Sequence, residues 1–207
     1  MAVALIDYGA GNLHSAEKAF RHVAGNQEIC VTADPRLIAQ ADRIVLPGVG
    51  AFADCIQGLQ AISGLTDALT EAVITRQRPF LGICVGMQMM MESGVEHGIH
   101  SGLGWIKGQV EAIHPVNPHY KIPHMGWNDL HIHDDHPVLH NIHAGDHAYF
   151  VHSFHALCTN PQDVLATVDY GTPITAIIAR DNMIGAQFHP EKSQKTGLKL
   201  IKNFLTL

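Results

Sequence analysis

The glycines on both sides of Cys84 predict a reactive cysteine. Cys84 stands in the run PFLGICVGMQ at residues 79–88, where apolar residues typical of a buried strand lead into a helix. Gly-x-Cys-x-Gly at such a junction is typical of a nucleophile elbow, a turn too tight for bulky neighbours. The start of the helix favours a thiolate, and the backbone N–H of Val85 becomes a candidate oxyanion donor. A buried structural cysteine is the alternative, and the paired glycines favour the nucleophile.

A cysteine nucleophile needs a base, and His189 stands in a suitable context. It lies in the run GAQFHPEKS at residues 185–193, directly after an expected strand. The ends of strands are where α/β sheets place their functional sites. Pro190 biases His189 towards an extended backbone, so Glu191 can approach the imidazole and orient it. A surface position is the alternative for any one of the sixteen histidines.

Two glycine-rich turns invite comparison with phosphate-binding loops. The run LPGVGAF at residues 46–52 has no Lys-Ser or Lys-Thr after it, which excludes a P-loop. The run GAG at residues 9–11 lacks the third glycine of a dinucleotide fingerprint, because His14 stands at that position. A loop at 46–52 that offers backbone N–H groups to a developing oxyanion therefore fits better.

Composition narrows the class of protein. The 207 residues, 46% of them hydrophobic, predict one α/β domain spanning 1–207, and the net charge of -6 argues against nucleic-acid binding. No apolar run reaches the roughly 18 residues that span a bilayer, and the first residues lack the basic region of a signal peptide. The four cysteines are widely spaced, which is typical of reduced thiols, so we expect a cytoplasmic protein.

Many of the histidines fall between His114 and His147, in a stretch that reads as a loop and includes HIHDDHP at residues 131–137. A zinc site is conceivable there, but neither HExxH nor a paired Cys–His spacing supports one. We therefore expect these histidines to be solvated surface residues, and we expect no metal site.

The order of the expected elements predicts the fold class. In the first half, apolar runs at 2–6, 43–46 and 79–83 predict strands, and 12–24, 52–62, 65–76 and 86–92 predict helices. In the second half, strands are expected at 103–113, 148–152, 164–170, 174–179 and 183–187, with a closing helix at 193–205. The alternation predicts a three-layer open sheet that is mostly parallel, and the short turns of the second half predict an antiparallel portion.

A series of motifs, in this order, resembles the glutaminase subunit of imidazole glycerol phosphate synthase. The motifs are DYGAGNL at 7–13, LPGVGAF at 46–52, PFLGICVGMQ at 79–88, PHMGWN at 123–128, YFVHSF at 149–154 and QFHPEKS at 187–193. Gly-x-Cys-x-Gly with a late His-Pro-Glu alone would indicate only the broader class I, triad-type glutamine amidotransferases. The resemblance covers nearly the whole chain.

The resemblance implies a role for each matching residue. Cys84 would be the nucleophile, His189 the general base and acid, and Glu191 the residue that orients the imidazole. The backbones of Val49, Gly50 and Val85 would line the oxyanion site, and Gln88, Glu96, Ser153 and Phe154 would hold glutamine. Asn12, Met125, Trp127, Tyr149 and Lys192 would face a partner and the ammonia exit.

The resemblance also implies the partner and the pathway. The partner would be a (β/α)8-barrel cyclase that uses the ammonia to form imidazole glycerol phosphate and an aminoimidazole carboxamide ribotide in histidine biosynthesis. The PGVG loop would keep its oxyanion donor turned away until that partner is loaded, and no metal or organic cofactor is implied. Two alternatives stay open: a triad amidotransferase that serves another acceptor, such as a nucleotide sugar, and a non-catalytic α/β protein with an exposed reactive cysteine.

Overall fold

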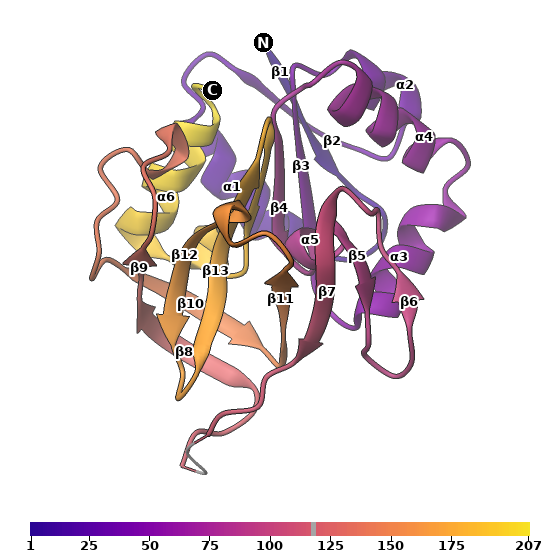
Figure 1. Ribbon diagram of the computed structural model, residues 1–207. Helices are drawn as coiled ribbons and strands as arrows, with labels where there is room; N and C mark the ends of the chain where they lie inside the picture. Colours follow the sequence, from indigo (N-terminus) through magenta and orange to yellow (C-terminus); the bar gives the residue numbers. More distant parts are fainter. Residues whose placement is uncertain (117–118) are drawn as a thin grey trace.

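The computed structural model describes residues 1–116 and 119–207. Over these residues, eight strands form one mixed sheet in the order β2-β1-β3-β4-β14-β13-β12-β9 (Figure 1). The neighbouring pairs from β2 to β14 are all parallel, whereas the pairs β14–β13, β13–β12 and β12–β9 are antiparallel. The predicted α/β class, with an antiparallel portion in the second half, is confirmed.

The strands are β1 (Ala2–Ile6), β2 (Glu28–Thr32), β3 (Arg43–Gly48), β4 (Phe80–Cys84), β5 (Met91–Gly94), β6 (His100–Ser101), β7 (Ile106–Ala112), β8 (His124–Asp129), β9 (His131–Ile132), β10 (His147–His152), β11 (Phe154–Cys158), β12 (Val164–Asp169), β13 (Pro173–Arg180) and β14 (Met183–Ala186). The α-helices are α1 (Leu13–Val23), α2 (Pro35–Gln40), α3 (Phe52–Ala61), α4 (Leu65–Thr70), α5 (Val85–Gln88) and α6 (Gln194–Phe204). Single turns of other helix types are η1 (Glu71–Thr75), η2 (Pro137–Leu139), η3 (Pro161–Asp163) and η4 (Pro190–Lys192).

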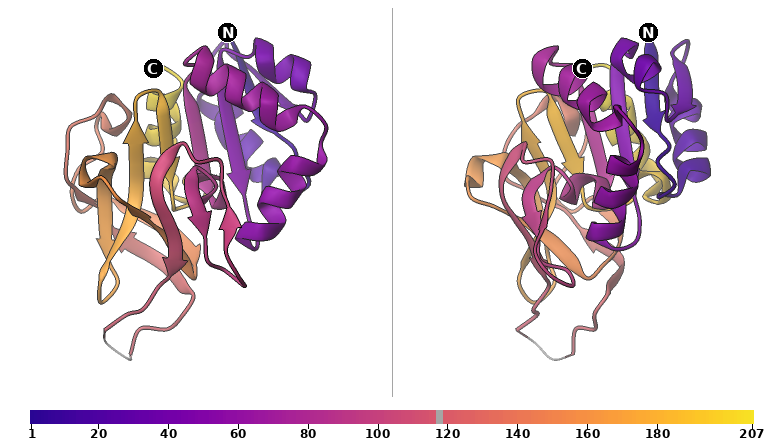
Figure 2. Two further views of the ribbon diagram at one scale, coloured as in Figure 1. Left: turned by 45° about the vertical axis from the view of Figure 1, so that its right-hand side comes forward. Right: turned by 90° about the vertical axis from the view of Figure 1, so that its right-hand side faces the viewer.

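Helices cover both faces of the main sheet. Helices α1 and α6 pack against each other on one face, and α2, α3 and α4 form the opposite layer, as the turned views show (Figure 2). The central strands are buried on both sides and are correspondingly apolar: β3 and β4 have no exposed residue. This closely packed centre holds the carboxyl ends of β3, β4 and β14 in place; Cys84 is the last residue of β4, and His189 follows β14 by three residues.

Two smaller sheets stand beyond those carboxyl ends. One pairs β10 with β8, and the other has the order β11-β7-β5-β6. Figure 1 shows both below the ends of the main strands, so the motifs on β3, β4 and β14 face residues of β10 and β11. The candidate site lies in this junction between the main sheet and the smaller ones.

The structure differs from the expected elements in a few places. The helix expected at 86–92 ends at Gln88, and β5 begins at Met91, because the chain from Met91 onward pairs with β7 and β6 instead. The helix expected at 65–76 continues past Thr70 as the π-helical turn η1. Strands β2, β5, β6, β8, β9 and β11 and helix α2 were not expected.

The histidine-rich stretch is not simply a solvated loop. It contains β8 and β9, and His124 is only 2% exposed, so the expectation of a surface position is wrong for this residue. Its ring is stacked on Phe150, which explains the burial. His114, His131 and His147 are exposed, in line with the prediction. Among the residues described, no helix is long and apolar enough to cross a membrane.

Candidate active site

Cys84 occupies a strained turn between β4 and α5. Its backbone has φ +55° and ψ −112°, although it is not a glycine. A non-glycine residue in such a region costs on the order of 1–3 kcal/mol and persists only where the surrounding structure imposes it. The turn ends β4 and starts α5 at the next residue, so the side chain leaves the strand at its carboxyl end. Sequence pattern and backbone geometry agree on a nucleophile elbow.

The glycines around Cys84 permit a close approach of backbones. A Cβ atom on Gly86 would lie 1.8 Å from the carbonyl oxygen of Leu46, in the neighbouring strand β3. A Cβ on Gly82 would lie 2.6 Å from the carbonyl oxygen of Gly86. Helix α5 therefore packs directly on strands β3 and β4, and the elbow has no room for larger residues at either position.

His189 and Glu191 form a buried pair beside the cysteine. The Nδ1 atom of His189 lies 2.9 Å from Oε1 of Glu191, and both side chains are 3% exposed. Pro190 begins the turn η4, which brings the carboxylate back to the imidazole, two residues earlier. The His189 backbone is held as well, since its N–H donates to the carbonyl of Tyr149 and its carbonyl accepts from the Ser193 hydroxyl at 2.7 Å.

The surroundings of His189 favour its protonated form. Burial lowers the pKa of the imidazole, but hydrogen bonds and charge interactions with Cys84 and Glu191 outweigh burial and raise the pKa to about 9. An imidazolium next to the sulfur stabilises a thiolate and supplies a proton to a leaving group. The two roles that a cysteine hydrolase needs from its histidine are both available in this geometry.

Two buried amides connect the sulfur to the far wall of the site. The Nε2 atom of Gln187 donates to Sγ of Cys84 at 3.7 Å, and its Oε1 accepts from Nε2 of Gln88 at 3.1 Å. Nε2 of Gln88 also donates to the carbonyl of Phe154 at 3.0 Å. Gln187 was not singled out from the sequence, and the available signal was its place two residues before His189 in a motif.

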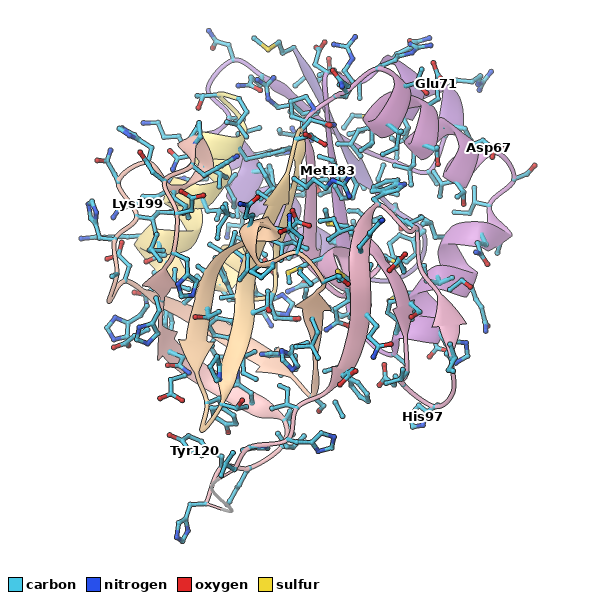
Figure 3. The ribbon with its side chains drawn as sticks, viewed as in Figure 1. Asp67, Glu71, His97, Tyr120, Met183 and Lys199 are labelled. Atoms are coloured by element: carbon cyan, nitrogen blue, oxygen red, sulfur yellow. The ribbon has the colours of Figure 1, made fainter. Side chains whose placement is uncertain are left out.

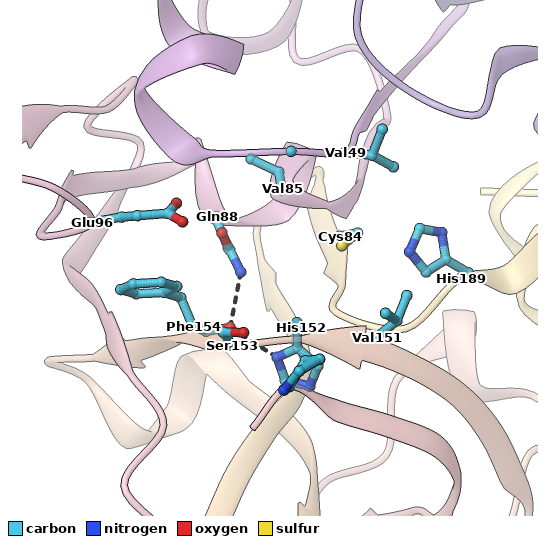
Figure 4. A pocket seen from close by; sticks show the side chains of 12 residues that line it. Val49, Cys84, Val85, Gln88, Glu96, Val151, His152, Ser153, Phe154 and His189 are labelled. Carbon is cyan, nitrogen blue, oxygen red and sulfur yellow. Dashed lines mark hydrogen bonds between the residues drawn. The ribbon is translucent and has the colours of Figure 1, made fainter. Parts of the chain in front are cut away.

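Cys84 opens into a pocket of about 310 Å³. Figure 4 shows Cys84 and His189 on one side of this pocket and Glu96, Phe154 and Ser153 on the other. The lining residues are Val49, Gly50, Cys84, Val85, Gln88, Glu96, Pro123, Val151, His152, Ser153, Phe154 and His189. All residues expected to form the oxyanion site and to hold glutamine are among them. His152 is a lining residue that the sequence reasoning missed, although it stands in the motif YFVHSF.

The loop after β3 reaches the mouth of the pocket. Gly50 has φ +105°, which an L side chain rarely adopts, and Val49 is 40% exposed. Glu96 reaches the same loop from the other direction, because its Oε2 accepts a hydrogen bond from the backbone N–H of Phe52 at 2.8 Å. One carboxylate oxygen thus caps the first turn of α3, while the side chain lines the pocket.

Two aromatic residues and one lysine among those expected to face a partner form a cluster. The rings of Trp127 and Tyr149 meet edge to face with centroids 5.9 Å apart, and Nζ of Lys192 lies 5.8 Å from the centroid of Tyr149. Met125 and Trp127 are 61% and 47% exposed, on the outward side of β8. Asn12 precedes α1, which packs against the turn η4 that carries Lys192.

The arrangement supports nucleophilic chemistry on a small acyl or amide group. It supplies a thiol, a histidine that can move a proton, a carboxylate that orients the histidine, and a pocket with polar groups on its far side. Over the described part of the chain, no three His, Cys, Asp or Glu side chains are placed to hold a metal ion.

Comparison with known proteins follows the same direction. The family model described as "Glutamine amidotransferase class-I" matches residues 4–207. The imidazole glycerol phosphate synthase subunit HisH of Cereibacter sphaeroides is 57% identical over 209 residues, covering 100% of this chain and 99% of that protein. The subunit of the same name from Rhodospirillum rubrum is also 57% identical, covering 99% of this chain and 98% of that protein.

Solved structures support the fold at much lower sequence identity. A crystal structure of a glutamine amidotransferase has a TM-score of 0.74 at 15% identity, with 99% of each chain covered. The structure of PurLQS from Thermotoga maritima has a TM-score of 0.72 at 18% identity, covering 99% of this chain and 97% of that chain. The three-layer architecture and its mixed sheet are therefore shared with these proteins.

Proposed function

The chain belongs to the class-I glutamine amidotransferases and, within them, to the family of the imidazole glycerol phosphate synthase subunit HisH, and from this membership we propose that it hydrolyses glutamine through a thioester on Cys84. The ammonia then serves the formation of imidazole glycerol phosphate in histidine biosynthesis. The observation that carries the assignment of residues is the strained Cys84 elbow beside the buried His189–Glu191 pair.

The first half of the reaction forms the thioester. The Cys84 thiolate attacks the side-chain carbonyl carbon of glutamine and forms a C–S bond, and the carbonyl electrons move to the oxygen. The imidazolium of His189 gives its proton to the amide nitrogen, the C–N bond breaks, and ammonia leaves. The raised pKa of His189 suits this step, because the imidazole enters it protonated.

The second half releases glutamate. His189, now neutral, takes a proton from a water that attacks the thioester carbonyl, and the C–S bond breaks to restore the thiolate. Glu191 holds the Nδ1 side of the ring throughout, so Nε2 is the nitrogen that faces the reacting atoms. Each half passes through an oxyanion, for which we propose the backbone N–H groups of Val49, Gly50 and Val85 as donors.

The pocket residues divide into two groups around the substrate. Gln88, Ser153 and Phe154 form the wall opposite the sulfur and hold the glutamine backbone together with Glu96, whose carboxylate suits an α-ammonium group. The oxyanion loop closes the remaining side. A pocket of about 310 Å³ suits an amino acid of this size.

The ammonia needs a protected route, because bulk water would protonate it. We propose a (β/α)8-barrel cyclase as the partner, docked on the face that carries Met125, Trp127, Tyr149 and Lys192, with Asn12 at its edge. Two exposed apolar side chains and a cation over an aromatic ring are features that protein interfaces favour. The whole chain acts as one amidotransferase domain, and its four free thiols fit the cytoplasm.

Glutamate release from glutamine tests the proposed function. The chain is assayed alone, with the cyclase of the same organism, and with the cyclase and its phosphorylated ribulose substrate. We expect the loaded partner to raise the rate by roughly 100- to 1000-fold, the value of one oxyanion donor. Absence of glutamate under all three conditions would exclude the function, and a partner other than the cyclase in a native pull-down would redirect it to another acceptor.

A further inference from the structure

Two buried histidines face each other across the small sheet, outside the Cys84–His189–Glu191 set. His124 on β8 and His152 on β10 are paired directly in the antiparallel register, and they are 2% and 7% exposed. Nδ1 of His124 lies 2.9 Å from Nε2 of His152. The mechanism uses neither ring, so their burial as a bonded pair requires an explanation.

The partners of the two rings fix the direction of every hydrogen bond. Nδ1 of His152 lies 2.8 Å from the carbonyl oxygen of Phe154, which only accepts, so this Nδ1 carries the proton. Burial lowers the pKa of His152 to about 3 and that of His124 to about 4, so both rings are neutral near pH 7. Nε2 of His152 is then an acceptor, and Nδ1 of His124 must donate to it.

Asn128 supplies the first donor in this series of hydrogen bonds. Its Nδ2 lies 3.4 Å from Nε2 of His124, the ring nitrogen that has no proton, and 2.9 Å from the carbonyl oxygen of Asp169. Its Oδ1 accepts from the N–H of Asp129 at 2.8 Å, so the orientation of the amide is defined. The series of hydrogen bonds therefore runs in one direction, from the Asn128 amide through both histidine rings to the Phe154 carbonyl.

The two ends of this series of hydrogen bonds lie at different surfaces, the glutamine pocket and the proposed partner face. The Phe154 carbonyl also accepts from Gln88, so it is part of the pocket wall opposite Cys84. Strand β8 alternates between its two sides, with His124 and Asn128 inward and Met125 and Trp127 outward. Asn128 and His124, which begin the series of hydrogen bonds, thus lie on the same short strand as Met125 and Trp127 of the proposed partner face.

We propose that His124 and His152 are positioning residues, a hydrogen-bonded relay of fixed direction that ties strand β8 of the partner face to the Phe154 carbonyl in the glutamine pocket. The relay rests on the proposed function, because it deepens the account of the same site. The relay holds the wall of the pocket that binds glutamine. A shift of β8 when the partner docks changes the position of that wall through two hydrogen bonds, His124–His152 and His152–Phe154, rather than by acting on Cys84 or His189.

Aromatic packing keeps the relay in place. The ring of His124 is stacked on Phe150 with centroids 4.9 Å apart. It also contacts the ring of Tyr170, with centroids 4.1 Å apart. Tyr170 in turn contacts Tyr120, which Figure 3 shows at the lower end of the molecule beside the β12–β13 turn. Stacking holds the plane of the His124 ring, and the hydrogen bonds at its two nitrogens define its orientation within that plane.

A matched pair of substitutions separates the bond from the packing. His124→Phe keeps an aromatic ring in the stack but removes the donor to His152, whereas His124→Asn loses the ring but keeps an N–H at the Nδ1 position. With the cyclase present, we expect His124→Phe to raise the KM for glutamine about 5- to 10-fold with kcat within about twofold, since one buried hydrogen bond is lost. His124→Asn should stay within about twofold of the parent in KM.

The opposite order, with His124→Asn the more impaired in KM, would show that packing alone is the role of His124 and would overturn the relay. An unchanged KM in both variants would overturn it too. Wild-type protein without glutaminase activity would instead remove the proposed function, so the two failures are distinguishable. Thermal unfolding of both variants verifies that the compared proteins are folded.

The tautomers give a second readout that needs no substitution. The relay requires both rings to be neutral with the proton on Nδ1, which is the less common tautomer of free histidine. Nitrogen NMR of the ¹⁵N-labelled wild-type chain at pH 7 should show two buried histidines with this pattern, assigned through the His124→Phe variant. A proton on Nε2 of His152 would contradict the proposed direction.

Discussion

The side-chain amide of Gln187 lies against the sulfur of Cys84, with 3.7 Å between Nε2 and Sγ. Gln187 is fully buried, and its oxygen is engaged by Gln88, so the amide cannot turn round. Only an N–H group faces the sulfur from this side. In the proposed mechanism this fixed donor would stabilise the Cys84 thiolate both before attack and when the thioester breaks.

The first prediction concerns this donor. Gln187→Glu keeps an oxygen for Gln88 but replaces the N–H at Cys84 with a second oxygen. We expect kcat/KM for glutamine to fall about 10- to 100-fold, the value of a hydrogen bond to a charged group. Gln162→Glu adds the same charge at an exposed position and is the control. Equal activity of the two variants would mean that Gln187 has no role at the sulfur.

The second prediction concerns Cys84, the proposed nucleophile. Cys84→Ala and Cys84→Ser should lose glutamine hydrolysis by several orders of magnitude, because the covalent route is removed. The proposed complex should still use added ammonium, since in this proposal the cyclase performs that step. Cys30→Ser changes a thiol in β2 and should leave the rate unchanged. More than a few percent of residual hydrolysis in either Cys84 variant would disprove the assignment.

In the third prediction, the proposed base His189 contributes more to the rate than Glu191, the residue proposed to orient it. His189→Ala removes the proposed proton-transfer group, whereas Glu191→Gln leaves a hydrogen-bonding partner 2.9 Å away but removes the charge. We expect the first to approach the loss in Cys84→Ala and the second to be milder. Because the three residues act as a unit, the Cys84/His189 double variant should lose little more than either single one. Losses that multiply would show that the residues act independently.

The fourth prediction is a maximum in stability near pH 6.5. The pKa of His189 is raised to about 9, so the folded state binds its proton more tightly, and this stabilisation is present below pH 6.5 and lost as the pH rises through 9. Burial lowers the pKa of His124 and His155 to about 4, so their contribution is present above pH 6.5 and lost as the pH falls towards 4.

Urea unfolding between pH 4.5 and pH 9.5 measures both sides of this maximum. In His189→Ala the decline above pH 6.5 should become shallower, while the decline on the acidic side should remain. In His155→Asn the acidic side should become shallower instead. If the free energy of unfolding fell equally above pH 6.5 in the parent and in His189→Ala, the raised pKa of His189 would be contradicted.

The fifth prediction tests the packing of the elbow. Gly86→Ala should destabilise the fold by about 1–3 kcal/mol or more, because the added methyl group would meet the Leu46 carbonyl at 1.8 Å. Gly145→Ala is the control, since Gly145 has φ +87° but nothing within 4 Å of an added Cβ, so only backbone strain applies. Equal free energies of unfolding for the two variants would mean that the elbow relaxes easily.

The sequence was sufficient for the parts of the site that a local pattern determines. Gly82, Cys84 and Gly86 predicted the elbow because each glycine answers a steric requirement of the turn itself. His189 and Glu191 were predictable as a pair because Pro190 sets the backbone between them. The central strands followed from uninterrupted apolar runs, which both-sided burial demands.

Features that depend on distant packing were not predictable. His124 looked like one more polar residue in a histidine-rich stretch, and only its pairing with β10 and its stacking on Phe150 explain its burial. The methionine run after α5 looked helical, yet β5 is fixed by its pairing with β7. The role of Gln187 depends on its contact with Cys84. The two residues are far apart in the sequence, and the pairing of β14 with β4 in the sheet brings them together.

The outward face of β8 has a consequence for the chain in isolation. Met125 and Trp127 together expose a large share of their apolar surface, at 61% and 47%. Such surface promotes concentration-dependent aggregation when nothing covers it. In the proposed complex the cyclase covers this face, so we expect an excess of this chain over the cyclase to aggregate and precipitate.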